Sequence, residues 1–400
     1  MWKQLAVPVF LGAALAASAA GGETASASFA DSASHWAKES IEKAVGKGYV
    51  DGYEDKTFRP DRQVSRGEFV KMVVTALKLP VSGKTDGGEW YVPYANAAVS
   101  AGIHRWSDFA GGDWNTPITR QEMARMVVRA TDRELQKAET NKPDGELMYL
   151  ATKAGLIQGL SGGELGEGEA TTRAQSVTVI ERILTVNGGG KLEVDKYAVN
   201  RAELAWHKTN IFTVMPEFFG KVLPISNNGV VLTDGWNPDN LFVETPDGNF
   251  RAELDSVIAI DMDDPSDPHR NLLGDVSKLK WWNPFTRNGQ SVFELSNCYV
   301  IYFKGRVAYN RDTSTYVNSD VFASQNISGI LTDRQDMENG IISGVSNIYQ
   351  NKLGDYPAKV IPKKVKTRGE ISINISAPAI PPNNIYTKYL LNSKVPESIE

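Results

Sequence analysis

Cysteine and histidine, which carry much of the chemistry of protein sites, are scarce in this chain. Its 400 residues include one cysteine and four histidines. A single cysteine cannot form an internal disulfide, and we expect Cys298 to be buried, because a free cysteine packs as a small apolar side chain. The histidines, among them His207 and His269, are too isolated to nominate a Ser/His/Asp triad or a zinc site, and Gly-x-Ser-x-Gly, His-Glu-x-x-His and Walker patterns are absent. We therefore expect no cofactor.

The chain also lacks an excess of positive charge. It has 43 Lys and Arg against 48 Asp and Glu, a formal net charge of −5. A sequence-independent nucleic-acid binder needs a broad basic surface to displace counterions from phosphate, so we exclude nucleic acid as a partner. The apolar fraction of 41% and the charged fraction of 23% are typical of a folded soluble protein. At about 100–200 residues for each domain, the length predicts two to three domains.

Long hydrophobic runs are missing except at the very start. Lys3 is followed by an uncharged run from Leu5 to Ala17 and by the small residues Ala17-Ser18-Ala19, the pattern of a secretory signal peptide. The run is too short to span about 30 Å of hydrocarbon, so a retained membrane anchor is the weaker alternative. A second small-residue site, Ala25-Ser26-Ala27, leaves cleavage open between Ala19 and Ala27. We assign residues 1–27 to the signal and expect a secreted protein with no integral membrane segment after cleavage.

The first 190 residues repeat with a period of 53–54. The segments Ser65-Arg66-Gly67-Glu68, Thr119-Arg120-Gln121-Glu122 and Thr172-Arg173-Ala174-Gln175 place their arginines 54 and 53 residues apart. Gly48, Gly102 and Gly155 each lie 18 residues before the corresponding arginine. Trp36 and Trp90 lie 30 residues before theirs, where the third repeat has Pro143. Each repeat predicts a helix, a glycine cap, a loop and a second amphipathic helix, and three such units can share one core.

The four-residue signature has a structural explanation. Ser or Thr followed three residues later by Glu or Gln is a capping box, which accounts for Ser65 with Glu68, Thr119 with Glu122 and Thr172 with Gln175. It leaves the arginines unexplained, because a cation in the first turn opposes the helix dipole. We infer that the free amides of each helix start and the adjacent guanidinium bind an acidic group of a partner. For Trp36 and Trp90, contact with a sugar ring and simple packing both remain open.

These residues resemble a known family. The run from Phe29-Ala30-Asp31 through His35-Trp36-Ala37, Gly48–Tyr53 and Phe58-Arg59-Pro60 to Ser65–Glu68 is similar to an S-layer homology module. The resemblance implies an all-α spindle of three repeats with pseudo-threefold symmetry and a central three-helix bundle, followed here by a mainly β C-terminal domain. It further implies non-covalent binding of a secondary cell wall polysaccharide that carries pyruvylated sugars. The residues it assigns to polysaccharide binding are Trp36, Asp51, Arg66, Trp90, Arg120 and Arg173.

The resemblance divides the chain and weakens along it. The repeats are residues 28–82, 83–138 and 139–187. The second has lost the Asp-Gly-Tyr loop, and the third lacks the tryptophan, ends in Gln175 and carries Glu164, Glu167 and Glu169 in its loop. Those acids would repel an acidic ligand if they lined its groove, so we expect one or two working sites and a mainly structural third repeat.

The remaining residues resemble no family. Gly188-Gly189-Gly190 predicts a flexible linker over residues 188–195, and residues 196–376 predict a mainly β domain. The β-branched runs that carry this prediction are Val230–Leu232, Val257–Ile260, Tyr299–Phe303 and Ile371–Ile375. Pro378, Pro381 and Pro382 predict an extended tail over residues 377–400.

Two features of this half allow a chemical reading beside a structural one. Asp261, Asp263 and Asp264 are a weak candidate for calcium, but neighbouring prolines favour a polar turn. Trp281-Trp282 offers a sugar platform, yet adjacent aromatics in a strand usually point to opposite faces, which favours packing. A carboxylate pair for glycoside cleavage needs only to be close in space, so the sequence leaves it open.

The sequence thus predicts a non-enzymatic cell-surface protein, exported and held to the bacterial cell wall or S-layer surface through residues 29–187. Its partners would be the secondary cell wall polysaccharide and, as the resemblance allows, S-layer or other surface proteins. The alternative is a wall-anchored extracellular hydrolase whose active site lies unrecognised in residues 191–400.

Overall fold

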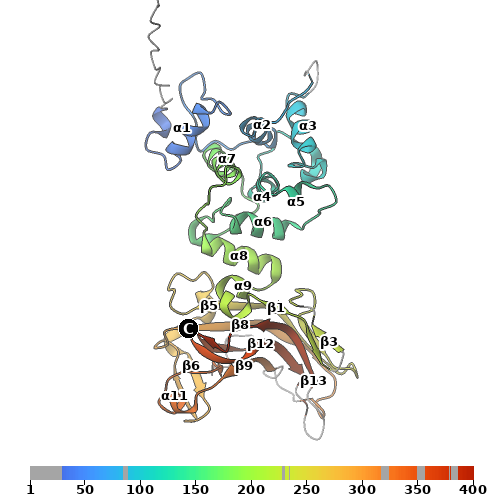
Figure 1. Cartoon of the computed structure of the whole chain (residues 1–400), viewed down its shortest axis with the longest axis vertical. Coiled ribbons are helices and arrows are strands. Elements are labelled where there is room, and N and C mark those ends of the chain that lie inside the picture. The colour runs from blue at the N-terminus through green and yellow to red at the C-terminus, as the bar shows by residue number, and fades with distance from the viewer. Residues whose placement is uncertain are drawn as a thin grey trace, which may run out of the picture.

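The structure is a computed structural model of the chain, and it describes residues 29–83, 89–227, 230–233, 235–316, 324–348, 356–377, 379 and 386–400. The predicted signal peptide lies outside the described residues. Helices occupy one end of the molecule and sheets the other, with one helix between them (Figure 1). The chain is therefore divided into a helical and a β-rich part, as the sequence predicts.

The helical part contains three pairs of helices, one pair in each repeat. The pairs are α1 (Lys38–Gly46) with α2 (Arg66–Ala76), α3 (Val92–Ser100) with α4 (Arg120–Arg129), and α6 (Asp144–Lys153) with α7 (Arg173–Asn187). The short helix α5 (Arg133–Gln136) and the 3-10 turns η1 (Ala30–Ser32), η2 (Trp106–Asp108), η3 (Ala110–Gly112) and η4 (Ser161–Gly163) complete it.

The helix ends follow the sequence signals. Helices α2, α4 and α7 each begin with a capping box, in which the Ser or Thr side chain accepts from the backbone of the Glu or Gln and the Glu or Gln accepts in return. Gly48, Gly102 and Gly155 follow the first helix of each pair with φ of 72°, 70° and 71°. Glycine adopts this left-handed conformation without a steric cost, which explains its place at all three helix ends.

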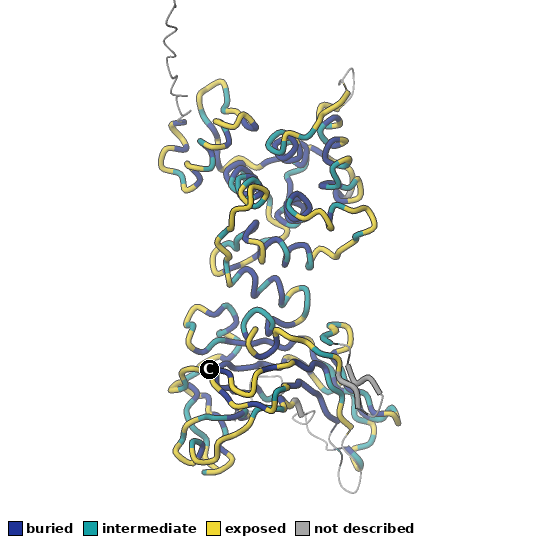
Figure 2. The backbone as a smooth tube through the Cα atoms, in the orientation of Figure 1, coloured by how far each residue is buried: buried dark blue, intermediate teal, exposed yellow. Residues whose placement is uncertain are grey.

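The three repeats close on one another through a ring of hydrogen bonds. The backbone N of Val64 donates to Thr171 O (3.0 Å), that of Thr171 to Ile118 O (2.9 Å), and that of Ile118 back to Val64 O (2.9 Å). Around this ring α2 packs on α3, α4 on α6 and α7 on α1, so each repeat's second helix covers the next repeat's first helix. Their apolar stripes are buried in one core, which appears dark blue in Figure 2.

The segment predicted as a flexible linker is packed instead. Gly188, Gly189 and Gly190 donate back to carbonyls of α7, and a Cβ added to Gly155 would lie 2.7 Å from Glu193 O. Asp195 then caps helix α8 (Lys196–His207), which packs on α6 and η4. The glycines here end helix α7 in a tight, hydrogen-bonded turn. The connection from the third repeat to α8 is therefore packed and not a flexible linker.

The β-rich part is built from two five-stranded antiparallel sheets with a shared core. It begins with the short helices α9 (Ile211–Val214) and α10 (Pro216–Phe219). One sheet has the order β1 (Val222–Leu223), β13 (Tyr386–Lys394), β12 (Val365–Ala377) and β14 (Ser398–Ile399), and β9 (Ser324–Leu331) also pairs with β12. The other has the order β10 (Ser346–Asn347), β11 (Tyr356–Pro362), β8 (Cys298–Asn310), β5 (Phe250–Asp261) and β4 (Phe242–Glu244).

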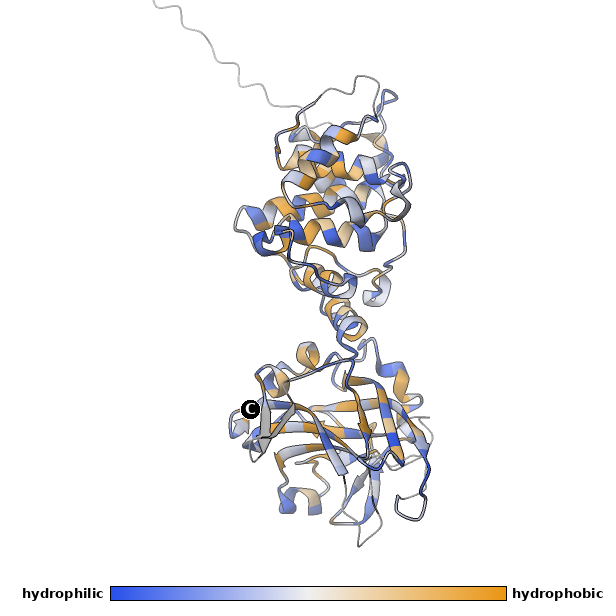
Figure 3. Cartoon of the chain, turned by 90° about the vertical axis from the view of Figure 1, so that its right-hand side faces the viewer, coloured by the Kyte–Doolittle hydropathy of each residue, from blue (hydrophilic) through white to orange (hydrophobic). Residues whose placement is uncertain are grey.

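The second sheet is buried on both faces. Val257 and Ala259 of β5 face the core between the sheets, while Ile258 and Ile260 face a second core on the outer side. That outer core lies beneath the hairpin of β6 (Lys280–Asn283) and β7 (Asn288–Ser291), helix α11 (Arg334–Glu338) and the turns η5 (Arg270–Leu273) and η6 (Val276–Lys278). Burial on both faces explains why this strand reads as a continuous apolar run. Figure 3 shows hydrophobic stretches, in orange, on the strands of the β-rich part. A further hairpin joins β2 (Ile225–Asn227) to β3 (Val230–Thr233).

The four predicted strand segments are all strands, and Cys298 and Trp281 are buried in the outer core as expected. Trp282, the next residue of β6, points away and is only partly buried.

The extended tail predicted for residues 377–400 is wrong. Ala377 ends β12, and Tyr386–Lys394 forms β13, which pairs with β12 and buries Leu390 and Leu391. The three prolines that motivated the prediction lie outside the described residues. The apolar pair Leu390-Leu391 within a β-favouring stretch outweighed them, because its burial completes the core between the sheets.

Candidate functional site

The three repeat arginines are buried against the chain itself. Arg66, Arg120 and Arg173 are 8%, 5% and 8% exposed. Arg120 and Arg173 donate to backbone carbonyls in the loop of the following repeat. The bonds are Arg120 Nε–Leu165 O and Nη2–Gln158 O, both 2.7 Å, and Arg173 Nε–Phe58 O (3.0 Å) and Nη2–Asp51 O (2.9 Å). For Arg173 of the third repeat, the following repeat around the ring is the first one. These side-chain hydrogen bonds therefore follow the same ring as the backbone hydrogen bonds.

The helix starts do not offer free amides, contrary to the premise of the anion argument. The backbone N of Arg66 donates to Thr116 O (3.0 Å), that of Arg120 to Glu169 O (2.9 Å) and that of Arg173 to Arg62 O (2.9 Å). The amide that follows each of them donates to the same loop as well. The neighbouring repeat satisfies these donors because the units assemble loop against helix start. The unfavourable first-turn arginine is thus explained in part by its role in joining repeats.

One cavity in the helical part combines residues of all three repeats. We call it the Trp36 groove. It has a volume of about 290 Å³, and Trp36, Arg120, Gln158, Gln175 and Arg182 are among its lining residues. Trp36 precedes α1 and is 64% exposed, while Gln175 and Arg182 come from α7. The groove thus brings together one predicted tryptophan and one predicted arginine, but from different repeats.

The Trp36 groove holds two cations and no carboxylate among its lining residues. Within the described residues, the hydrogen bonds of Arg120 go to the two carbonyls above, and Arg182 donates to Leu156 O (3.3 Å) and to Gln158 Oε1 (2.8 Å). Burial lowers the pKa of both guanidinium groups, and the nearby charge of Arg120 lowers that of Arg182 further. Two cations near each other, bonded only to neutral acceptors, form a site that favours an anion.

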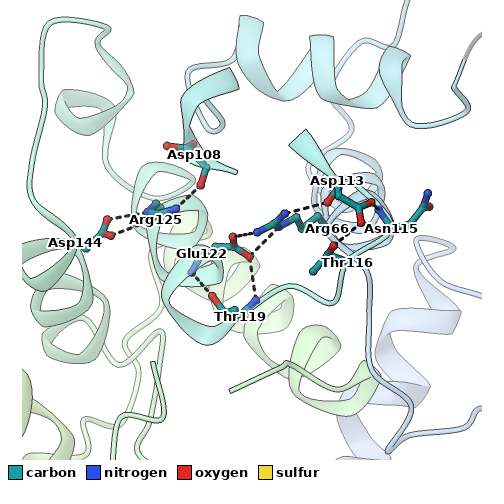
Figure 4. A network of polar contacts seen from close by, with 9 residues as sticks. All are labelled: Arg66, Asp108, Asp113, Asn115, Thr116, Thr119, Glu122, Arg125 and Asp144. Carbon is teal, nitrogen blue, oxygen red and sulfur yellow. Dashed lines mark hydrogen bonds and ion pairs between the residues drawn. The ribbon is translucent and has the colours of Figure 1, made fainter. Parts of the chain in front are cut away.

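The corresponding surface of α4 is neutralised from within the chain. Glu122 binds Arg66 through both of its oxygens, with 3.1 Å between Arg66 Nε and Glu122 Oε2 (Figure 4). Arg125 binds Asp144, at 2.6 and 2.7 Å. This surface has no tryptophan at the position of Trp36, because the third repeat has Pro143 there.

Arg129 of α4, which occupies the place that Arg182 has on α7, is also paired. It binds Asp108 Oδ2 at 2.6 Å. Although burial acts in the opposite direction, the approach of His104 Nδ1 to Asp108 Oδ2 (3.3 Å) and the hydrogen bond from Arg129 lower the pKa of Asp108 to about 2. The carboxylate stays charged, and the cations of α4 are already matched.

The remaining predicted site residues are separated from the Trp36 groove. Trp90 is 40% exposed and rests on the start of α2, where a Cβ added to Gly67 would lie 3.2 Å from the indole ring. Asp51 is exposed and contributes only its backbone carbonyl, to Arg173. Arg173 lies over the rings of Tyr53 and Phe58, with centroid distances of 5.0 and 4.5 Å. Polysaccharide contact by these residues stays a prediction.

The acidic loop of the third repeat does not line the Trp36 groove. Glu164 pairs with Arg201 of α8 at 2.9 Å, and Glu164 and Glu167 line a separate cavity of about 320 Å³ beside α8. Glu169 is exposed. None of the three acids lines the Trp36 groove, although the charge of Glu169 acts on the pKa of Arg120 against the effect of burial, and the third repeat contributes much of the groove.

Arg182 and Gln158 were missed by the sequence reasoning. Arg182 lies nine residues after Arg173, as Arg129 lies nine after Arg120, but the first repeat has Thr75 there. The recurrence of arginine at this position in two of the three repeats was the signal that could have identified Arg182.

The calcium candidates of the β-rich part are engaged by lysines. Lys363 Nζ lies 2.6 Å from Asp261 Oδ1 and 2.9 Å from Asp263 Oδ2, and Lys196 Nζ lies 2.6 Å from Asp264 Oδ2. Across the described ranges no group of three or more His, Cys, Asp and Glu side chains is placed to hold a metal ion. Nor is any helix in the described part of the chain both long and apolar enough to cross a membrane.

Comparison with known proteins assigns a family to the first repeat. Residues 28–70 match the family model of the S-layer homology domain, so the chain carries such a domain at its first repeat. The chain is 33% identical over 104 residues to "S-layer protein sap" of Bacillus anthracis, a match that covers 24% of this chain and 13% of that protein. It is 28% identical over 179 residues to an amylopullulanase of Thermoanaerobacterium thermosulfurigenes, covering 40% of this chain and 10% of the relative.

A third relative is a cellulosome-anchoring protein of Acetivibrio thermocellus, 44% identical over 50 residues, 12% of this chain and 11% of that protein. The chain thus spans only about a tenth of the length of each of these three relatives. These matches point to the cell surface or cell wall.

Proposed function

We propose that this chain is an exported surface protein held non-covalently to the bacterial cell wall, with residues 29–187 acting as three S-layer homology units. Their ligand is a secondary cell wall polysaccharide that carries an acidic, pyruvylated sugar. The β-rich part is presented to the outside in a structural or interaction role, with S-layer or other surface proteins as its partners.

The observation that carries this proposal is the charge of the Trp36 groove. The groove has two arginines, no lining carboxylate and an exposed indole at its edge. A carboxylate ketal on a sugar would accept from the guanidinium groups, while the apolar face of the sugar ring would cover Trp36. A neutral polysaccharide would leave the two charges unmatched.

Wall binding is tested by sedimentation of the full mature chain. We expect it to pellet with native walls and to remain in solution with walls stripped of their secondary polysaccharide. Trp36→Ala should reduce pelleting without unfolding the protein, because this side chain is mostly exposed. Trp106→Ala is the matched control, since Trp106 is 53% exposed and does not line the groove. Equal pelleting with native and stripped walls would refute polysaccharide binding.

We propose a non-enzymatic role for the β-rich part. Burial raises the pKa of Glu203 to about 7 and also raises that of Asp267, the kind of shift found in catalytic acids. Glu203 accepts from Phe212 N (3.1 Å), however, and Asp267 accepts from the backbone of Asp261 (3.0 Å) and His269 (2.9 Å). Both carboxyls thus serve backbone donors inside the fold. Release of reducing sugar from wall polysaccharides by the purified chain would support the hydrolase alternative instead.

A further inference from the structure

One side of the first sheet carries polar side chains that point away from the core between the sheets. Along β12, Ile371, Ile373 and Ile375 lie in that core. Successive side chains of a strand point to opposite faces, so Ser372 and Asn374 point to the other side of the sheet. The middle of that side is therefore occupied by a hydroxyl and an amide.

The strands next to β12 continue this pattern in register. Ser372 lies opposite Ser328 of β9 and Asn392 of β13, and Asn374 lies opposite Asn326 and Tyr389 in the same way. We call these two rows the neutral face, and its residues are Asn326, Ser328, Ser372, Asn374, Tyr389 and Asn392. None of the six is charged. Tyr389 belongs to neither apolar core, which indicates that no further apolar layer of the described residues covers this side.

The hydrogen-bonding groups of the neutral face are largely unused. Asn374 is 4% exposed, and its side chain makes one hydrogen bond within the described part of the chain, to Ser328 Oγ at 3.5 Å. The side chains of Ser372, Asn326 and Tyr389 make none with described residues. An amide buried this deeply with one long hydrogen bond is costly, so the neutral face favours a ligand that supplies hydrogen-bond partners.

The positions that flank the neutral face are satisfied by the chain itself. Ser376 Oγ and Thr387 Oγ1, which follow along β12 and β13, bond to each other at 2.8 Å. At the opposite end, Asn392 Nδ2 donates to Glu370 Oε2 (3.3 Å). The unused groups are thus gathered in the middle of the sheet, across three strands that span about 10 Å.

The side chains of the neutral face restrict the kind of ligand. The face has no cation to match a carboxylate or a phosphate. With Tyr389 as its one aromatic residue, it also lacks the cluster of apolar anchors through which protein partners bind. Hydroxyl and amide side chains both donate and accept hydrogen bonds, as sugar hydroxyls do, and a tyrosine ring can cover the apolar side of a sugar.

We propose that the neutral face is a binding site for an uncharged glycan. Sugar hydroxyls bond to Asn326, Ser372 and Asn374, and a sugar ring packs on Tyr389. Asn326 and Ser328 are exposed on β9, so the ligand reaches the middle strand from that side. The β-rich part then has a ligand of its own, different in charge from the acidic polysaccharide proposed for the repeats.

The test is affinity electrophoresis of the full mature chain in native gels that contain a neutral polysaccharide. The probes are hydroxyethyl cellulose, glycol chitin and dextran, and we expect at least one of them to slow the chain. Asn326→Ala and Ser372→Ala each remove one neutral hydrogen bond to the ligand, so each should weaken the retardation by about 2- to 12-fold. Neither should lower the thermal unfolding midpoint, because neither side chain has a hydrogen-bond partner among the described residues.

The matched control is Asn288→Ala, which removes an exposed asparagine from strand β7, outside the neutral face. It should be slowed as the original chain is. Trp36→Ala should be slowed equally as well, because Trp36 belongs to the repeats, and this arm separates the inference from the proposed wall anchoring.

Three outcomes would overturn the proposal. The first is that none of the three polysaccharides slows the chain. The second is that Trp36→Ala abolishes the retardation while Asn326→Ala leaves it unchanged, which would assign glycan binding to the helical part. The third is self-association in sedimentation velocity that Asn326→Ala abolishes, which would assign the neutral face to a second copy of the chain.

Discussion

Replacing Arg173 by alanine should open the ring of repeats at its longest connection. The guanidinium group joins the third repeat to the first, through carbonyls that lie 115 and 122 residues earlier in the chain. Alanine would remove both hydrogen bonds and leave the carbonyls of Phe58 and Asp51 without this donor. It would also remove a cation from above the ring of Phe58.

The expected loss of stability is large. A hydrogen bond to a charged group contributes about 1.5–3 kcal/mol, so two of them in a buried setting predict a loss of about 3–6 kcal/mol. Domains are commonly stable by only about 5–15 kcal/mol, so the substitution would remove a large share of the stability of the helical part. Wall binding would then fall because less of the protein is folded, not because a contact with the ligand is lost.

Urea unfolding followed by circular dichroism at 222 nm measures this effect. Every described helix of eight or more residues lies between Lys38 and His207, so the helical signal reports on this part of the molecule. Arg133→Ala is the control, because Arg133 is exposed on α5. If Arg173→Ala unfolds within about 0.5 kcal/mol of the original chain, as surface substitutions do, the arginine does not hold the ring closed.

Two further predictions concern pH and the contact between α8 and the β-rich part. Burial raises the pKa of Glu203 from 4.5 to about 7, so its contribution to stability is fully present below pH 4.5 and falls by about 3 kcal/mol as the pH rises through 7. Chemical unfolding between pH 4.5 and 8 should show this decline, and Glu203→Gln should flatten it; an unchanged slope would contradict the assignment. Burial lowers the pKa of His269 from 6.5 to about 4, so its contribution is fully present above pH 6.5 and falls by about 3 kcal/mol as the pH drops towards 4. His269→Gln should remove that acid-side loss, and a variant that is as acid-sensitive as the original chain would show that another group is responsible.

The local pattern of the helical part was predictable because its signals are local. Capping boxes, glycine caps and apolar stripes each depend on residues within a few positions of one another, and all three repeats have them as expected. The strand at β5 was predictable for the same reason, from four consecutive apolar residues.

The hydrogen-bond partners of the repeat arginines could not be predicted from the sequence spacing that revealed these residues. The partners of Arg120 lie 38 and 45 residues away in a loop with no recognisable acceptor signal, because the acceptors are backbone carbonyls. The sequence prediction also treated each repeat as one site that is either complete or degenerate. The Trp36 groove instead combines Trp36, Arg120 and Gln175 from three different repeats. A repeat that had lost its tryptophan could therefore still supply a groove wall. The tail prediction failed because prolines were weighed above Leu390 and Leu391.

Helix α8 also has a mechanical consequence. It is held to the third repeat through Arg201 and Glu164, and to the β-rich part through Lys196 with Asp264 and through Asn200, which accepts from Asn210 Nδ2 (2.7 Å) and lies 3.0 Å from His269 Nε2. Twelve residues of helix make a strut of about 18 Å. Because this helix contacts both parts, a force on the β-rich part is passed on to the ring of repeats. A flexible linker would instead take up the force by extending. Helix α8 consequently sets the orientation of the β-rich part relative to the repeats through contacts on both sides.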